Sequence, residues 1–202
     1  MKRKRIITLV CLLVGLQSFI ACRPIPTEPE LAPGEVRDRT FTSDDWGFSI
    51  TVPPDSLWSL RAIQRFYIRE SNGLSPVQVI MYRANPGFPN RPVVLLDSFG
   101  RAEGQTLEIS AALFETQFEQ SFVSYNVQGQ KTSGVIGGVE SVEWVFRARE
   151  PQSGPHVLNN RFLSVIFQRG DQVYQIVCSG QQGNFPEAEF RGILGTFAFI
   201  KP

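Results

Sequence analysis

Histidine and cysteine, the residues that most often ligate transition metals or act as nucleophiles, are scarce in this sequence. Its 202 residues include one histidine, His156, and three cysteines, Cys11, Cys22 and Cys178. Their spacing predicts neither a disulfide framework nor a zinc site. Cys178, in the apolar stretch VYQIVCSG, is typical of a small buried residue rather than a nucleophile. A lone histidine in the loop SGPHVLNN is typical of a solvated residue. We therefore expect no metal and no cofactor.

Recognisable catalytic motifs are also missing. The chain has no P-loop, dinucleotide-binding glycine motif, HExxH, CxxC or G-x-S-x-G nucleophile elbow. Two pairs of acidic residues, Asp44 with Asp45 and Glu140 with Glu143, have side chains that suit acid-base chemistry or calcium binding. Ordinary solvated charges on a loop and a strand explain them better. We expect no enzyme, and the alternative is a hydrolase that uses His156 or an acidic pair, or a protein that binds a small ligand or metal.

The chain lacks a strong excess of charge of either sign. Its formal net charge is +1, and residues 2–5, KRKR, supply four of the 20 basic residues, so the rest is slightly acidic. The remaining arginines are scattered among acids, whereas nucleic-acid binding needs clustered basic residues. We expect no nucleic-acid partner. The composition, 42% hydrophobic and 11% aromatic, suffices for one folded domain with a real core.

No apolar run is long enough for an ordinary membrane span. Residues 6–21, IITLVCLLVGLQSFIA, follow the basic start and fall short of the roughly 20 residues that a spanning helix needs. A basic start, a short apolar core and a small residue at its end are typical of a signal peptide. We therefore predict a signal peptide over residues 1–21.

The end of this run, Phe19-Ile20-Ala21-Cys22, resembles the lipobox of bacterial lipoproteins. In that motif a small residue precedes a cysteine that accepts a diacylglycerol group and becomes the new N-terminus. Phe19 stands where leucine is usual, so simple cleavage or an uncleaved anchor remain the alternatives. The resemblance implies lipidation at Cys22, a palmitate-bearing anchor in the cell membrane, and a domain that faces the extracytoplasmic side.

A proline-rich tether is predicted over residues 22–40, ahead of a globular domain over 41–202. The segment contains four prolines and three glutamates between residues 24 and 35, which favours extended, solvated chain. At about 3.1 Å per residue, residues 23–39 would reach roughly 50 Å from the bilayer.

The sequence of the globular part predicts mainly strands, together with two helices. We predict strands at WGFSITVP (46–53), AIQRFYIRE (62–70), VQVIMYRA (77–84), GGVESVEWVFRARE (137–150), RFLSVIFQ (161–168) and QVYQIVCSG (172–180). A helix is the alternative for 62–70, because Arg61, Arg65 and Arg69 also fall at helical spacing. Pro53-Pro54 ends the first, and Arg169-Gly170-Asp171 predicts a hairpin between the last two.

Apolar residues at intervals of three or four predict the two helices. The first lies within 104–122, with Thr106 as its cap, and carries a stripe formed by Leu107, Ala111, Phe114, Phe118 and Phe122. The second follows Pro186, which we place at the first helical position, and its apolar side is Phe190, Ile193, Leu194 and Phe197.

Three tryptophans are candidates for a binding role only if one lies in a cleft. Trp46 and Trp58 flank the first strand and its turn, where we expect them to fix that edge to the sheet. Trp144 lies in the middle of a predicted strand, so we expect it in the core.

Taken in order, several motifs resemble the PsbP-like family. They are DDWGFSITVPPDSLW (44–58), the Gly137-Gly138 entry to VESVEWVF, the strand GDQVYQIVCSG, and the closing FPEAEFRGILGTFAF, in which Thr196 replaces the serine of the family. The resemblance implies an α+β fold, an α/β/α sandwich on a central antiparallel sheet with flanking helices. The family includes photosystem II extrinsic proteins, a nuclear-transport factor and bacterial lipoproteins. Some members hold metals, but no such site transfers residue by residue to this chain.

These observations together predict a lipid-anchored, non-catalytic domain. Its expected partners are the membrane, through the anchor, and a protein of the envelope or of a membrane complex, which it binds or stabilises. Fold alone does not assign such a function.

Overall fold

The computed structural model describes residues 34–44, 46–54, 57–64, 77–83, 92–149 and 160–200. Cys22, Asp45 and His156 therefore lie outside the described residues, as do the predicted signal peptide and most of the predicted tether. The first described strand, Glu35–Arg37, falls within the segment that we assigned to the tether.

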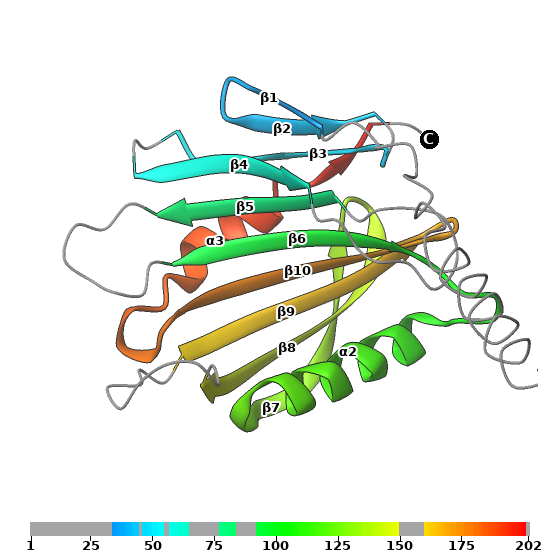
Figure 1. The fold of residues 1–202 in the computed structure, drawn as a ribbon, viewed down its shortest axis with the longest axis vertical. Helices are drawn as coiled ribbons and strands as arrows, with labels where there is room; N and C mark the ends of the chain where they lie inside the picture. The colour runs from blue at the N-terminus through cyan, green and yellow to red at the C-terminus, as the bar shows by residue number, and fades with distance from the viewer. Residues whose placement is uncertain are drawn as a thin grey trace, which may run out of the picture. The chain divides into compact units, whose positions relative to one another are not determined.

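The described strands form two antiparallel sheets (Figure 1). The smaller has the order β1-β2-β3-β11, from β1 (Glu35–Arg37), β2 (Thr40–Ser43), β3 (Phe48–Thr51) and β11 (Ala198–Phe199). The larger has the order β4-β5-β6-β10-β9-β8-β7, from β4 (Trp58–Gln64), β5 (Val77–Arg83), β6 (Val93–Gly100), β7 (Val123–Ile136), β8 (Val139–Arg149), β9 (Asn160–Arg169) and β10 (Gln172–Gln181). The larger sheet thus joins two runs of neighbouring hairpins, β4 to β6 and β7 to β10, at the β6–β10 pair.

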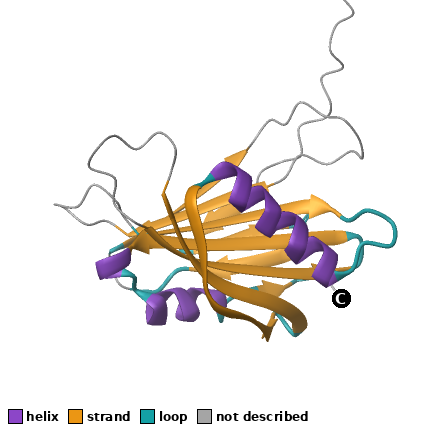
Figure 2. Ribbon diagram, turned by 90° about the horizontal axis from the view of Figure 1, so that it is seen from below, coloured by secondary structure: helices purple, strands orange, loops and turns teal. Residues whose placement is uncertain are grey.

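Two α-helices, α2 (Leu107–Ser121) and α3 (Glu187–Leu194), lie on opposite faces of the larger sheet (Figure 2). α2 packs mainly on β7, β8 and β9. α3 and the smaller sheet cover the opposite face, where their side chains join one large apolar cluster. Since successive residues of a strand point to opposite faces, β8 contributes Trp144 and Phe146 to the α2 side and Val145 to the α3 side.

Both predicted helices are confirmed, with one shift at a boundary. The Thr106 side chain caps α2 by accepting a hydrogen bond from the Ile109 backbone N–H at 3.3 Å. The predicted stripe of α2 packs on the sheet. α3 begins at Glu187, so Pro186 is its N-cap rather than its first residue. Phe197 lies beyond the helix end but is buried as expected, with its ring 5.3 Å from that of Phe48.

The strand predictions agree with the structure where a turn motif marks the end of the strand, and several strands without such a motif were not predicted. The β9–β10 hairpin is confirmed, with Gly170 in the left-handed region at φ +60°. The strand predicted over 62–70 already begins at Trp58, and its part after Gln64 lies outside the described residues. Sequence patterns did not single out β1, β2, β6, β7 or β11.

Candidate functional site

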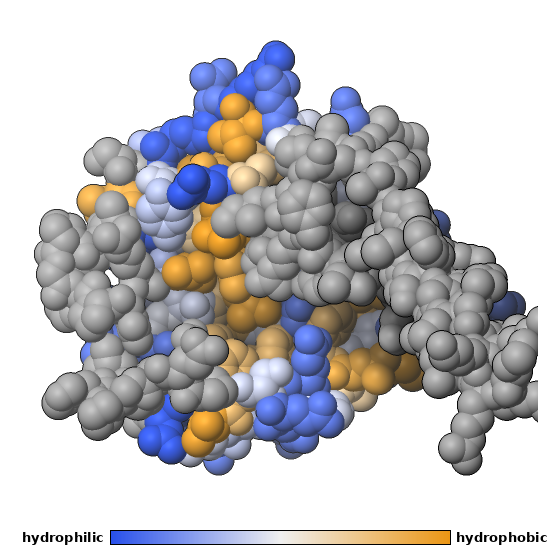
Figure 3. Space-filling model, in the orientation of Figure 1, coloured by the Kyte–Doolittle hydropathy of each residue, from blue (hydrophilic) through white to orange (hydrophobic). Residues whose placement is uncertain are grey.

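The α2 face of the larger sheet is covered by a described helix over only half of its width. α2 lies over β7, β8 and β9, and its Phe114 reaches Phe99 near the end of β6, with 5.4 Å between the ring centroids. Beyond that contact, β5, β6 and β10 present side chains on the same face that no described helix covers. Figure 3 shows hydrophobic side chains gathered at the centre of this face.

Strand register assembles an apolar row on this uncovered half. Ile80 pairs with Leu95, and Leu95 pairs with Val177, so the three side chains lie side by side across β5, β6 and β10. Each is only partly buried. Exposed Arg61 of β4 pairs with Ile80 and borders this row. We give the name open face to the surface formed by the row, by Arg61 and by the polar pair described next. It consists of Arg61, Ile80, Tyr82, Val93, Leu95, Asp97, Gln175 and Val177.

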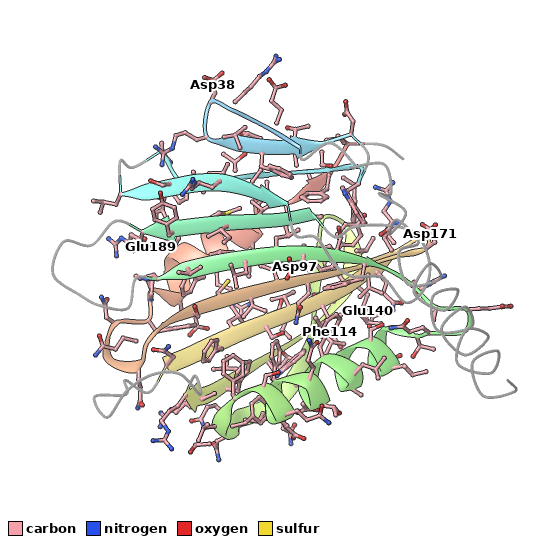
Figure 4. The ribbon with its side chains drawn as sticks, viewed as in Figure 1. Asp38, Asp97, Phe114, Glu140, Asp171 and Glu189 are labelled. Atoms are coloured by element: carbon pink, nitrogen blue, oxygen red, sulfur yellow. The ribbon has the colours of Figure 1, made fainter. Side chains whose placement is uncertain are left out.

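A polar pair lies in the floor of the open face. Asp97 on β6 and Gln175 on β10 are direct register partners and are only 9% and 7% exposed. Figure 4 shows Asp97 on β6 and Phe114 on α2. The Nε2 amide nitrogen of Gln175 has no hydrogen-bond partner. An unmade hydrogen bond at a buried polar group costs about 1–3 kcal/mol, and such groups in native proteins call for an explanation. The Gln175 amide is thus a buried donor that no side chain or backbone group satisfies.

The two predicted acidic pairs do not form acid-base sites among the described residues. Glu140 and Glu143 occupy β8 three residues apart, so they point to opposite faces of the sheet. Glu140 is exposed, whereas Glu143 is buried on the α3 side and forms an ion pair with Arg191. Asp44 is exposed in the turn after β2, and its neighbour Asp45 lies outside the described residues.

Glu143 belongs to a network that fastens α3 to the sheet. Arg191 of α3 bridges Glu143 and Glu187, and Glu187 also pairs with Arg161 of β9 at 3.3 Å. Gly134 makes room for the Glu143 carboxylate, because a Cβ atom there would lie 2.5 Å from its oxygen. These contacts have a structural role, since they hold α3 against β8 and β9. We call the Glu143–Arg191 ion pair the clamp.

All three tryptophans serve the core, as expected, and none belongs to the open face. Trp58 donates from its indole nitrogen to Glu189 of α3 at 2.8 Å, while Trp46 accepts a hydrogen bond from Tyr174 through its backbone carbonyl. Trp144 donates to the Tyr125 hydroxyl at 3.1 Å. Burial raises the pKa of Tyr125 to about 12.

Cys178 is fully buried on the α3 side of β10, as predicted. Desolvation raises the pKa of its thiol far above the usual range, which keeps it protonated and unreactive. Within the described ranges no cluster of three or more histidine, cysteine and acidic side chains is placed to hold a metal ion. No helix among those same residues is both long and apolar enough to cross a bilayer.

Sequence patterns singled out neither Asp97 nor Gln175. The available signal was a polar residue that interrupts an apolar strand, Asp97 in VVLLDSF and Gln175 in VYQIVC. Only the β6–β10 pairing, between segments more than 70 residues apart, brings the two together.

Comparison with known proteins places the fold. No protein-family model and no curated protein sequence matches this chain. Among solved structures, it resembles cyanobacterial PsbP (CyanoP) from Synechocystis sp. PCC 6803, with a TM-score of 0.52, 10% identity, and coverage of 89% of this chain and 97% of that one. The Ran-binding protein Mog1p of Saccharomyces cerevisiae aligns with a TM-score of 0.48, 9% identity, and coverage of 83% and 97%. The predicted fold class is confirmed: the chain has a mixed α+β, PsbP-like fold, and its described residues form antiparallel sheets and the α-helices α2 and α3.

Proposed function

We propose that this protein is a lipid-anchored, non-catalytic binding domain on the extracytoplasmic side of the cell membrane, where it binds or stabilises a protein of the envelope or of a membrane complex. The open face carries the proposal. Partly buried Ile80, Leu95 and Val177 form an apolar row beside the polar pair Asp97 and Gln175, and an apolar surface with a few fixed polar groups is typical of a binding site.

The proposed anchor rests on the sequence around Cys22. A basic start, a short apolar run and Ala21-Cys22 favour lipidation, and the prolines that follow favour an extended tether. With β1 beginning at Glu35, the segment from Cys22 to Gly34 would span roughly 40 Å in the polyproline conformation. That length lets the open face reach a partner that stands above the membrane surface.

Metabolic labelling tests the anchor. Labelled palmitate is expected to enter the wild-type protein and not the Cys22→Ser variant, and only the wild type is expected to remain with membranes after a salt wash. Equal labelling of both proteins would refute the lipid anchor.

Crosslinking on intact membranes tests the binding function. We expect an affinity-tagged wild-type protein to yield the same crosslinked partner in repeated experiments. Leu95→Lys, which places a charge in the open face, is expected to abolish that product. Val135→Lys is the matched control, because Val135 is an apolar residue on β7 that is 70% exposed and distant from the open face in the strand order. An equal yield from all three proteins would exclude the open face as the binding surface.

A further inference from the structure

We infer that the outward side of α2 binds an amphipathic helix of a partner protein, and that lysine or arginine side chains flank the apolar stripe of that helix. This surface shares no residue with the open face, so its role goes beyond the proposed function. Three features of α2 support the inference: its exposed apolar side chains, the two rows in which they are arranged, and the restriction of its charges to one flank.

α2 carries apolar side chains on the side that faces away from the sheet as well as on the side that packs on it (Figure 2). At 100° per residue, Ile109 lies directly opposite Phe118, which packs on the sheet. Ile109 and Leu113 are 47% and 58% exposed. A surface helix ordinarily has charged and polar side chains in these positions. We call the outward residues that recur at intervals of three or four the outer stripe: Ile109, Ala112, Leu113 and Thr116.

The outer stripe has the shape that a second helix needs. Ile109 and Leu113 form one row along α2, and the smaller Ala112 and Thr116 form the row beside it. The Thr116 hydroxyl donates to the Ala112 backbone carbonyl at 3.0 Å, so its donor is satisfied within α2. A row of large side chains beside a row of small ones makes a ridge next to a groove, and helices pack by placing ridges of one in grooves of the other.

The charged residues of α2 all lie on one flank of the outer stripe. Glu108, Glu115 and Glu119 share this acidic flank, and α2 contains no basic residue. Glu115 pairs with Lys131 of β7, whereas Glu108 and Glu119 are exposed near the two ends of the helix. At 1.5 Å per residue they lie about 16 Å apart along the axis. Because complementary charges guide association and fix orientation, we expect the partner helix to carry basic side chains about three turns apart on one flank.

Two other occupants fit the charges of α2 less well. A second copy of this chain would bring the same glutamates to the contact and no basic residue from its own α2, so like charges would oppose the pairing. An anionic bilayer attracts surfaces with several lysines or arginines close together, and the acidic flank would be repelled. A basic amphipathic helix matches both the outer stripe and the acidic flank.

Photocrosslinking in the full chain on intact cells tests what occupies the outer stripe. A photoreactive amino acid replaces Leu113, and the control position is Val135 on β7, which is 70% exposed. We expect position 113 to capture a protein and position 135 to capture none. Mass spectrometry should place the crosslink in a segment with apolar residues every three or four positions and lysine or arginine beside them.

Every other crosslinking result would overturn the inference. These results are capture of a segment without helical periodicity or without basic residues, crosslinks only to lipid, to a second copy or to other residues of this chain, and no crosslink from position 113.

A synthetic peptide with the captured sequence tests the outer stripe in binding to the purified full-length protein. We expect the peptide to become helical on binding, and Ile109→Gln/Leu113→Gln to weaken binding at least tenfold. Both side chains are largely exposed, so the double variant should keep a urea midpoint close to that of the wild type. Val135→Gln is the control and should bind as the wild type does. Unchanged affinity of the double variant would refute the role of the outer stripe.

Salt dependence of the same binding tests the acidic flank. Glu108→Gln/Glu119→Gln should weaken binding at least about threefold at 50 mM salt, and the difference from the wild type should disappear at about 500 mM. The control, Glu35→Gln/Glu140→Gln, removes two exposed acidic side chains outside α2 and should leave the affinity unchanged. The same salt dependence in all three proteins would refute the charge complementarity.

The outer stripe and the open face can fail separately. If position 113 captures a basic amphipathic helix while Leu95→Lys leaves the crosslinked partner unchanged, the outer stripe is the binding surface and the open face is not. If Leu95→Lys abolishes the crosslinked product and position 113 captures nothing, the proposed function stands and the inference about α2 is wrong.

Discussion

The two faces of the larger sheet are covered to different extents. On the α3 side, the smaller sheet and α3 seal the apolar side chains, and ion pairs and aromatic contacts fasten both to the sheet. On the α2 side, one helix covers β7, β8 and β9 and leaves the open face. The contrast leads us to expect that stability depends mainly on the α3 side, while the α2 side keeps partly exposed apolar side chains that the proposed partner would contact. Substitutions on the two faces should therefore separate folding from binding.

The largest effect is expected from Phe167→Ala. Phe167 is fully buried on the α3 side, with its ring 5.2 Å from Tyr174 and 4.8 Å from Phe197. Its truncation should lower the free energy of unfolding by about 3–5 kcal/mol, measured by urea denaturation. Phe114→Ala is the matched control on the partly buried α2 side and should lose less. Equal losses would contradict the proposed asymmetry.

Breaking the Glu143–Arg191 clamp is expected to lower the free energy of unfolding less than truncating a side chain of the aromatic core. Arg191→Ala leaves the buried Glu143 carboxylate without its partner, which should lower the free energy of unfolding by about 2 kcal/mol. The double variant Glu143→Gln/Arg191→Met should recover at least half of that loss, because it removes the unpaired charge. Arg37→Ala, which breaks an exposed pair with Glu35, is the control and should change stability by less than about 0.5 kcal/mol. If the double variant is no more stable than Arg191→Ala, the clamp argument is wrong.

Burial of Cys178 on the α3 side is expected to make the free energy of unfolding fall at alkaline pH. Burial raises the pKa of its thiol, so above the usual value of about 8.5 the unfolded chain releases a proton that the folded protein retains. Stability should therefore fall as the pH rises above about 8.5, by about 1.4 kcal/mol per pH unit from this group alone. The test compares urea midpoints of the wild type and Cys178→Ala between pH 7.5 and 10. Parallel pH profiles would show that Cys178 does not titrate as described.

The smallest effect on stability is expected on the flank of α2. Leu113→Ala removes a mostly exposed side chain and replaces it with a strong helix former, so the unfolding free energy should change by less than about 0.5 kcal/mol. Loss of stability above 1 kcal/mol would mean that Leu113 belongs to the core of the α2 side.

Local sequence patterns predicted the elements whose signals are contained in one short segment. The stripe and Thr106 cap predict α2, and the Arg169-Gly170-Asp171 turn predicts the β9–β10 hairpin. β6 was not predicted because VVLLDSFG begins with four consecutive apolar residues, so apolar and polar residues do not alternate along it. β7 was not predicted from the sequence because it is an exposed edge strand. Its sequence, VSYNVQGQKTSGVI, is largely polar, and its register with β8 shifts twice. The open face could not be predicted from local sequence patterns because it depends on pairing between strands that are distant in the sequence. Lipidation at Cys22 stays a prediction, since Cys22 lies outside the described residues.

The β6–β10 pair has a consequence for how the domain folds. Strands β4 to β6 and β7 to β10 each form from hairpins that are neighbours in the chain, but β6 meets β10 only after a loop of more than 70 residues closes. Closure of long loops is slow and entropically costly, which favours the β6–β10 ladder as a late step in folding. A partner bound to the open face, as proposed, would cross this ladder and contact both halves of the sheet. Binding would then hold the two halves together by mass action, so the partner would act as the last structural element of the fold.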